Sequence, residues 1–476
     1  MVQVVIDVSK YILLIILILY GINCFRAMHR FGEHEKKTKL TTQYFLIFMF
    51  HSLGFSVLVL DTMNGKLALL YVMEVVYLIV MIAVTKILYP NLAKALFQNM
   101  LMLMSIGFVM LARLTPDKAE RQFMIICVAS VITFFIPYLM KKLLCIKKLS
   151  WLYAAAGIVL LMAVFVIGQA TRGSKLSFEI FGIGIQPSEF VKILYVFFIA
   201  SVLAKCADLF NLLQVSIFAA VHVLILVLSK DLGSALIFFI VYACMIYVST
   251  GKWYYFAGIM AIGVAAACVA GTVFSHVQNR VIAWQDPFSV IDGSGYQIAQ
   301  SLFAIGTGGW FGLGLNQGAP LTIPFVEEDV AISAISEELG LISALLILLI
   351  MLSCFVLFVM TAMRMKDKFY KYVALGLAAT YIFQVFLTVG GAFKFIPLTG
   401  VTLPLISYGG SSILSTMIIF SIIQGIYMLQ STICEDDVYV EDNDTMKYEE
   451  DNQNVEFQDM EDLIMKQTDI NDYRIR

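Results

Sequence analysis

The sequence predicts an all-α protein that crosses a membrane many times, and two observations support this fold class. Hydrophobic residues make up 60% of the 476 positions and charged residues only 14%, with a mean hydropathy of +0.87, whereas about a quarter of the residues in soluble domains are charged. The apolar residues also fall in runs long enough to cross the hydrocarbon core of a bilayer, which takes about 20 helical residues. The short alternating segments of a transmembrane barrel do not occur. We therefore expect a polytopic helical membrane protein.

Thirteen apolar runs are predicted as membrane-spanning helices, three before residue 90 and ten after it. Two runs meet at Lys230 and Asp231 almost without a loop, which predicts a helical hairpin or broken helices. The predicted spans are residues 11–25, 44–60, 67–84, 97–114, 123–140, 151–170, 190–204, 212–229, 232–249, 254–274, 339–360, 372–389 and 413–429.

Three basic loops, residues 26–39, 141–148 and 364–371, predict the orientation of these spans. Loops rich in Lys and Arg tend to stay in the cytoplasm. Thirteen crossings place all three loops on that side, together with the C-terminal tail. The same count places the N-terminus and the long segment 276–338 outside.

The C-terminal tail has a composition unlike the rest of the chain. From Glu435 onwards it holds fifteen acidic against four basic residues, which predicts a solvated, disordered extension, with a docking tail for a partner as the alternative. The eight cysteines are scattered and form no CxxC pair. The sequence therefore indicates neither a zinc site nor a disulfide framework.

Segment 276–338 is the longest stretch that a membrane cannot hold, and we expect it to carry the function. Long loops in compact folds are usually functional or disordered, and the aromatic residues here argue against disorder. A carboxylate flanked by apolar residues can act as a general base. Five glycines between residues 306 and 314 lack the strand and the Lys-Ser/Thr of a nucleotide-binding loop, so close packing of a turn is expected. The candidate side chains are Arg280, Asp286, Asp292, Gln297, Gln300, Glu327, Glu328, Asp329, Glu337 and Glu338. Glu337 and Glu338 precede an apolar helix, so they alternatively stabilise its N-terminus.

Ionisable residues at the borders of the apolar runs form a second candidate site. Glu189 and Lys192 lie at i, i+3 on one helix face, either as a structural salt bridge or as the charged wall of a substrate cavity. Asp231 either faces a polar cavity or reaches the membrane interface as a snorkelling charge.

Residues 390–412 interrupt the apolar pattern with two prolines, several glycines and hydroxyl side chains. Irregular backbone at membrane depth is tolerated only where it is buried in protein or lines a cavity. Lys394 adds a positive charge suited to a phosphate or a carboxylate, and Ser411 and Ser412 add hydroxyls. We expect this region to line the cavity.

Five motifs in order resemble the SEDS family, which includes FtsW, RodA and SpoVE. They are QPSEF-x-K from Gln186, KDLGSA from Lys230, GSGYQIAQSLFAIGTGG from Gly293, EELG from Glu337 and IPLTGVTLPLISYGGSS from Ile396. The resemblance covers about residues 97–429, which hold ten spans, the usual number in the family. It implies a SEDS-like core at 91–432, extra N-terminal helices at 1–90, and a cytoplasmic tail at 433–476 outside the resemblance.

The resemblance implies a peptidoglycan glycosyltransferase in the bacterial cytoplasmic membrane. Such enzymes polymerise lipid II, a disaccharide-pentapeptide on undecaprenyl pyrophosphate, at the outer face for elongation, division or sporulation. The implied partners are a class B penicillin-binding transpeptidase and other elongation or division proteins, and nucleic acid is not among them. A loop aspartate is implied as the general base in an inverting attack by the acceptor 4-hydroxyl. A divalent cation, Mg²⁺ or Mn²⁺, could assist the leaving group.

One position departs from the family pattern, because Val290 stands where the second acid of this loop is usual. The role of the base is therefore assigned to Asp292 and Asp286 jointly, while Asp329 matches another family acid. A lipid II flippase, which needs no base, and a catalytically impaired scaffold for a partner synthase are the alternatives. The residues expected to bind substrate are Glu189, Lys192, Asp231, Arg280, Gln297, Gln300, Asp329, Lys394, Ser411 and Ser412.

Overall fold

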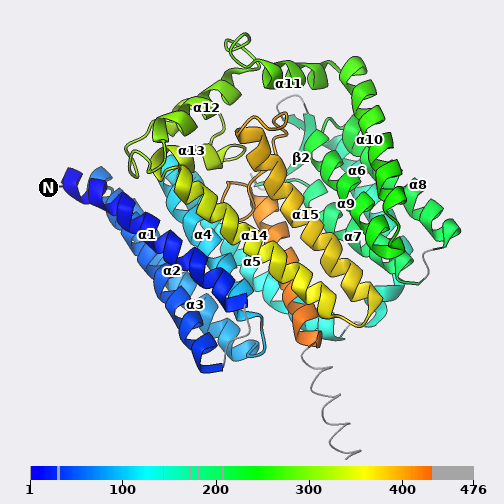
Figure 1. The fold of residues 1–476 in the computed structure, drawn as a ribbon, viewed down its shortest axis with the longest axis horizontal. Helices are drawn as coiled ribbons and strands as arrows, with labels where there is room; N and C mark the ends of the chain where they lie inside the picture. Colours follow the sequence, from blue (N-terminus) through cyan, green and yellow to red (C-terminus); the bar gives the residue numbers. More distant parts are fainter. Residues whose placement is uncertain are drawn as a thin grey trace, which may run out of the picture. The chain divides into compact units, whose positions relative to one another are not determined.

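The computed structural model describes residues 2–28, 33–142, 144–171, 174–180, 183–205 and 208–430. The predicted acidic tail at 433–476 and part of the basic loop at 26–39 lie outside these residues. The chain divides into two units, Met1–Ile426 and Tyr427–Arg476. The elements named here lie in the first unit, apart from the last four residues of the final helix, which ends at Gln430. Apart from one small sheet, the described elements are helices (Figure 1). The predicted fold class is confirmed.

The N-terminal part consists of three long helices, α1 (Val2–Met28), α2 (Glu33–Thr62) and α3 (Gly65–Leu88). In Figure 1 they form the blue group on one flank. Helix α1 packs against α2 and α14, and α2 packs against α4. The three helices therefore lie directly against the rest of the bundle.

The remaining long helices form the larger part of the bundle and follow the predicted spans. They are α4 (Lys94–Leu114), α5 (Pro116–Lys142), α6 (Ser150–Ile167), α7 (Ser188–Leu203), α8 (Leu209–Leu228), α9 (Leu232–Thr250), α10 (Trp253–Val273), α14 (Leu341–Arg364), α15 (Lys368–Ala392) and a final helix, Gly410–Gln430.

Twelve helices of the described part are long and apolar enough to cross a membrane. The thirteenth predicted span, 190–204, corresponds to α7, which has only 16 residues and is buried along nearly its whole length. Helices α8 and α9 pack together as the predicted hairpin. Their tight turn places Lys230 in the left-handed region, at φ 64°.

Acidic and amide side chains begin several of these helices. Asp208, Asp231 and Asp367 each accept a hydrogen bond from a backbone N–H in the first turn of α8, α9 and α15, respectively. Asn64 does the same for α3. Such caps satisfy amide groups that have no partner within the helix.

The loops gather at two ends of the bundle. Lys147 forms an ion pair with Asp367, which joins the predicted basic loops 141–148 and 364–371 at one end. The short helix η1 (Leu144–Lys148) lies in the first of these loops. At the other end Lys10 and Arg113, from α1 and α4, contact residues of the long segment. The start of α1 and the long segment therefore lie at the same end.

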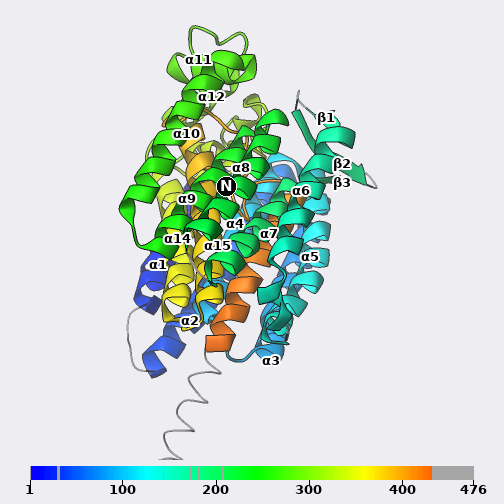
Figure 2. The same cartoon turned by 90° about the vertical axis from the view of Figure 1, so that its right-hand side faces the viewer.

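A small antiparallel sheet connects α6 to α7, where a loop was predicted. Its strands are β1 (Gln169–Thr171), β2 (Ser174–Ile180) and β3 (Ile183–Ile185), in that spatial order. Phe178 pairs with Ile185 in the β2–β3 ladder. The sheet lies at one end of α6 in Figure 2 and delivers the chain to the start of α7.

Segment 276–338 is folded, as its aromatic content predicts. It contains α11 (Ser275–Gln285), α12 (Tyr296–Gly308), the short helix η2 (Pro320–Thr322) and α13 (Ala331–Glu338). Helices α11 and α12 extend across the end of the bundle (Figures 1 and 2). The predicted close packing holds for Gly308 and Gly312, where a Cβ atom would lie 2.1 Å from the Ser336 and 2.3 Å from the Glu338 carbonyl oxygen, whereas Gly306 and Gly309 have open space around them.

Candidate functional site

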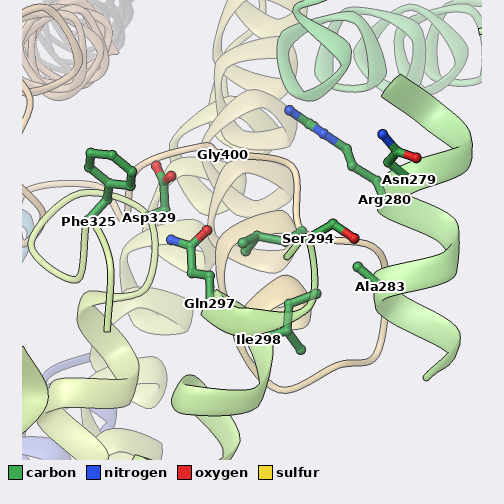
Figure 3. A pocket seen from close by; sticks show the side chains of 10 residues that line it. Asn279, Arg280, Ala283, Ser294, Gln297, Ile298, Phe325, Asp329 and Gly400 are labelled. Carbon is green, nitrogen blue, oxygen red and sulfur yellow. The ribbon is translucent and has the colours of Figure 1, made fainter. Parts of the chain in front are cut away.

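A pocket of about 240 Å³ opens at the end of the bundle that carries the long segment (Figure 3). Helices α11 and α12 form two of its walls. The stretch before α13 and the loop after α15 form the others. Its lining residues are Asn279, Arg280, Ala283, Ser294, Gln297, Ile298, Phe325, Asp329, Leu398 and Gly400. The pocket thus unites two regions that are far apart in sequence, segment 276–338 and region 390–412.

Arg280 supplies the positive charge of the pocket. Its guanidinium donates a hydrogen bond of 3.2 Å to the carbonyl oxygen of Thr399. Burial lowers the pKa of Arg280, and the nearby carboxylates of Asp231 and Asp329 oppose this shift. Even so, an arginine remains protonated at neutral pH. Its charge therefore lies in the field of two acids from different parts of the chain.

Asp329 supplies the carboxylate of the pocket, and Gln297 lies beside it (Figure 3). The amide of Gln297 donates a hydrogen bond of 2.8 Å to the carbonyl oxygen of Pro324, which fixes the side chain against the stretch leading to Asp329. A Cβ atom on Gly400 would lie 3.9 Å from an oxygen of Asp329, and Gly400 has φ 73°. Glycine allows this left-handed backbone to pass close to the acid.

Below the pocket a buried polar network joins α7, α15 and the final helix. Lys192 forms the predicted pair with Glu189, at 2.6 Å, and donates a second bond of 2.7 Å to Gln384. Ser415 donates a bond of 2.7 Å to the same Glu189 oxygen. Lys192 and Glu189 are both less than 10% exposed. Buried charges need this degree of pairing, because an unpaired ion in a low-dielectric interior is very unfavourable.

Residues of region 390–412 extend this network. The amide of Gln384 donates bonds to the carbonyl oxygen of Thr402 at 3.1 Å and to the hydroxyl of Ser412 at 3.3 Å. Thr402 itself donates a bond of 2.6 Å to Ser412. The prediction that this irregular region lines polar space is confirmed, because Leu398 and Gly400 line the pocket.

Asp231 interacts electrostatically with Glu189 of the network and with Arg280 of the pocket. Besides capping α9 through Ser234, its carboxylate accepts bonds from the Ser188 hydroxyl at 3.1 Å and the Gln186 amide at 3.4 Å. Burial raises its pKa, and the bonds from Ser234 and Ser188 oppose this. The hydroxyl of Ser411 accepts a bond of 2.9 Å from the backbone N–H of Gln186. Asp231 is thus a buried acid, not a snorkelling surface charge.

Nine of the twelve predicted site residues do not line the described pocket. Five of them, Glu189, Lys192, Asp231, Ser411 and Ser412, belong to the buried polar surroundings described above, and the other four lie outside both. Asp286 and Asp292 are exposed on the turn between α11 and α12, where Asp286 accepts a bond of 3.3 Å from the N–H of Ser289. Gln300 is half-buried one turn beyond Gln297. Lys394 is half-buried at φ 60°, and its carbonyl oxygen accepts a bond from the Trp284 indole.

Several residues of the site were not predicted. Gln384 and Thr402 belong to the buried network, and Asn279, Ser294 and Phe325 line the pocket. Gln384 could have been found, because it is a lone amide within an apolar span, and polar residues in spans commonly face a cavity or one another. Ser294 and Thr402 lie within the quoted motifs, and Asn279 and Phe325 lie within segment 276–338, but no charge or spacing distinguishes these four residues from their neighbours.

The expected divalent cation does not find a ligand set among the described residues. They contain no group of three or more His, Cys, Asp or Glu side chains placed to hold a metal ion. Asp329 is the single carboxylate of the described pocket lining. A Mg²⁺ ion at this carboxylate would therefore need phosphate oxygens of a substrate as further ligands.

Together the fold and the pocket define a multi-pass membrane protein with a charged site at one end of its helical bundle. Residues 86–432 match the FtsW/RodA/SpoVE family, described as cell cycle proteins. This match covers more than half of the chain, so the protein belongs to that family. The predicted resemblance is confirmed.

Two relatives show how far the similarity extends. Peptidoglycan glycosyltransferase RodA of Mycobacterium tuberculosis is 36% identical over 297 residues, which are 58% of this chain and 63% of that protein. Probable peptidoglycan glycosyltransferase FtsW of Saccharophagus degradans is 30% identical over 349 residues, which are 69% of this chain and 90% of that protein. The chain thus spans less than two thirds of the mycobacterial relative.

Solved structures confirm the fold. A chain from a structure on the coordination of polymerization and crosslinking by a peptidoglycan synthase complex matches with a TM-score of 0.61 at 24% identity, over 71% of this chain and 98% of that one. The rod shape determining protein RodA of Thermus thermophilus matches with a TM-score of 0.54 at 21% identity, over 71% and 97%.

Proposed function

We propose that this protein is a peptidoglycan glycosyltransferase that polymerises lipid II at the outer face of the bacterial cytoplasmic membrane. The observation that carries the proposal is the pocket in which Asp329 and Arg280 face common space at one end of a membrane bundle. Family membership and the names of the relatives support the same activity. A donor attached to a membrane lipid can reach such a pocket without leaving the bilayer.

In the proposed reaction Asp329 is the general base. Its carboxylate accepts the proton of the acceptor 4-hydroxyl while that oxygen attacks the anomeric carbon of the donor sugar. The bond from this carbon to the pyrophosphate oxygen breaks, and its electron pair leaves with undecaprenyl pyrophosphate. Attack from the side opposite the leaving group inverts the anomeric centre. Asp329 is assigned this role because its carboxylate lines the pocket.

Arg280 binds the pyrophosphate in this proposal. A guanidinium presents a planar fork of donors that matches phosphate oxygens, and charge-assisted bonds of this type are the strong ones. Burial increases their strength, because the low dielectric weakens screening. The Thr399 carbonyl oxygen holds the guanidinium in position before substrate arrives. Arg280 would therefore stabilise the charge that develops on the leaving group.

The predicted bases Asp286 and Asp292 are the alternative to Asp329. Their turn precedes α12 and is exposed. Either carboxylate can take a proton only from an acceptor sugar that lies over this turn, outside the pocket. Their role remains a prediction from the family resemblance, and the experiment below separates the three acids.

The buried network supports the floor of the site. Glu189 and Lys192 neutralise each other through their hydrogen-bonded ion pair. Asp231 interacts electrostatically with Arg280. We assign these residues, with Ser411 and Ser412, to holding the pocket in shape for the lipid-linked pyrophosphate. Lys394, Gln300 and Gln297 are assigned to contacts with the sugar and peptide parts of substrate.

The loops at the two ends of the bundle support the proposed orientation of the protein in the membrane. The basic loops 141–148 and 364–371 lie together, opposite the long segment, and basic loops mark the cytoplasmic side. The pocket and the N-terminus then face outward and the tail faces the cytoplasm. We propose a class B penicillin-binding transpeptidase as the partner that crosslinks the product, because a structural neighbour comes from a complex that polymerizes and crosslinks.

The test is polymerisation of fluorescent lipid II by the purified full chain together with its cognate transpeptidase. Wild type should give glycan polymer on a gel, and Asp329→Asn should give none. Asp117→Asn is the matched control, because Asp117 is an exposed acid at the same end of the bundle. Absence of polymer from wild type would contradict the proposed activity.

The same set of proteins tests the alternatives. Full activity in Asp329→Asn, with activity lost in Asp286→Asn or Asp292→Asn, would move the base to the exposed turn. A flippase would move labelled lipid II across proteoliposome membranes without forming polymer. A scaffold would do neither, but would raise the activity of its partner synthase.

A further inference from the structure

Residues 309–319, called here the connecting segment, join α12 to η2 and fold onto the end of α13. The backbone N–H groups of Leu313 and Gly314 donate bonds of 3.0 and 2.9 Å to the carbonyl oxygens of Glu337 and Glu338. A Cβ atom on Gly312 would lie 2.3 Å from the Glu338 carbonyl oxygen, so the contact needs glycine. One side of the connecting segment is therefore closely packed against the end of α13.

Helix α1 packs against another side of the connecting segment. The ammonium group of Lys10 donates a bond of 3.2 Å to the Gly312 carbonyl oxygen. The rings of Tyr11 and Phe311 lie 6.1 Å apart between centroids. Ile6 is 1% exposed, and its Cγ2 lies 3.4 Å from the position of a Cβ atom on Gly314. Two turns of α1 thus supply one polar and two apolar contacts.

Helix α2 contributes a further bond through its last turn. A carboxylate oxygen of Asp61 accepts a hydrogen bond from the side-chain amide of Asn316. Asn316 has φ 67°, a left-handed conformation that asparagine tolerates better than most residues. Its backbone N–H donates a bond of 3.1 Å to Glu338. Asn316 is therefore held from both sides, by α2 and by α13.

In the sequence, the connecting segment lies between the residues that form two walls of the pocket. Gln297 and Ile298 precede it on α12, and Phe325 and Asp329 follow it. Fixing this segment therefore fixes how far α12 lies from Asp329. The two helices that fix it, α1 and α2, lie entirely before the family match, which begins at residue 86. The contacts therefore join the matched core to helices outside the match.

We propose that α1 and α2 position the substrate pocket, with Lys10 and Asp61 as positioning residues that hold the connecting segment. The expected effect on catalysis rests on the proposed function. Neither side chain touches the pocket, so each acts through Gly312 or Asn316. Such positioning matters for the reaction rate, because small displacements of a catalytic group strongly reduce turnover.

Hydrogen–deuterium exchange of the full-length protein tests the proposal directly. In Lys10→Ala/Asp61→Ala the amides of Leu313 and Gly314 should exchange about five- to tenfold faster, which corresponds to the loss of one or two hydrogen bonds that oppose local opening. Asp7→Ala/Lys66→Ala is the matched control. It also removes one acid and one base, both exposed, from the N-terminal helices. Equal exchange in the two double variants would overturn the proposal.

Turnover supplies the second readout. The Lys10→Ala/Asp61→Ala variant should lose about tenfold in kcat with little change in KM, since it disturbs geometry more than binding. Asp61→Asn, which keeps an oxygen acceptor for Asn316, should restore most of the loss seen in Asp61→Ala. Faster exchange with unchanged turnover would overturn the positioning role. A wild-type protein without polymerase activity would overturn the proposed function, and the exchange result would still decide whether α1 and α2 hold the segment.

Discussion

The two halves of the long segment differ in how firmly the rest of the protein holds them. At the start of the first half, α11 has one buried residue, Ala283, and the following turn exposes Asp286 and Asp292. Helix α12, after this turn, buries five of its residues. In the second half all eight residues of α13 are buried. Arg113 of α4 pairs with Glu338 there at 2.9 Å. The first half lies over the pocket, whereas the second half is built into the bundle.

This difference separates two tasks that one loop performs. A buried, multiply bonded stretch keeps its geometry, while an exposed stretch with few tertiary contacts opens at low free energy. Asp329 follows the connecting segment in the held half, and Arg280 comes from the loosely held half. We expect the held half to set the position of the base, and the exposed turn between α11 and α12 to close over the substrate while Arg280 stays bonded to Thr399.

The largest effect should come from Asp329→Asn. The change keeps size and hydrogen-bonding capacity but removes the proton acceptor, so kcat should fall by about 10²–10⁴. Lipid II polymerisation measures it, and thermal unfolding should be close to wild type. If kcat fell less than about threefold, the held half would not carry the base.

The second-largest effect is expected in the free energy of unfolding. Arg113→Met leaves Glu338 buried without its partner, and breaking a buried pair destabilises by about 3–5 kcal/mol. Thermal unfolding in detergent measures the loss. Arg113→Met/Glu338→Leu should recover part of it, because no charge is then left unpaired. A single variant as stable as wild type would show that the held half does not depend on this pair.

A smaller effect is expected for Arg280→Lys in the loosely held half. Lysine keeps the charge but loses the planar fork, so kcat/KM for lipid II should fall about ten- to a hundredfold. The dependence of the rate on donor concentration measures it. Asn279→Ala, a change at the neighbouring pocket residue, is the control. Equal rates for wild type and Arg280→Lys would argue against pyrophosphate binding by this side chain.

The pH dependence of stability should report on Glu338. Burial raises its pKa to about 7, against the opposing effect of Arg113. The folded state therefore favours the neutral acid, so this stabilisation is complete below the unfolded pKa of about 4.3. It is lost as pH rises through about 7. The Tm of wild type relative to Glu338→Gln should decrease over this range, and parallel Tm profiles would contradict the shift.

The smallest effect is expected on the exposed turn. Asp286→Asn and Asp292→Asn should each change kcat by less than about twofold, because neither carboxylate lines the pocket. The same polymerisation assay measures both. A loss near that of Asp329→Asn would show that the turn folds into the site with substrate, and the contrast between the halves would then be wrong for catalysis.

The sequence predicts the bundle well because hydropathy alone specifies it. The Glu189–Lys192 pair and the hairpin at Lys230 follow from local spacing, and both are present. Strand β2 was missed because short strands depend on pairing with neighbours. The sequence names Asp329 and Arg280 as candidates for one site, but it could not predict the pocket geometry between them. This geometry depends on left-handed residues such as Asn316 and Gly400, whose conformations are set by distant contacts.

The shortness of α7 has a consequence for water. Its 16 residues extend about 24 Å at 1.5 Å per residue, less than the hydrocarbon thickness of about 30 Å. If α7 reaches the cytoplasmic side with its neighbours, its first turn begins several ångströms inside the bilayer. Glu189 and Lys192 then lie below the level of the lipid headgroups. Their mutual pairing replaces the water that two such charges would otherwise need at this depth.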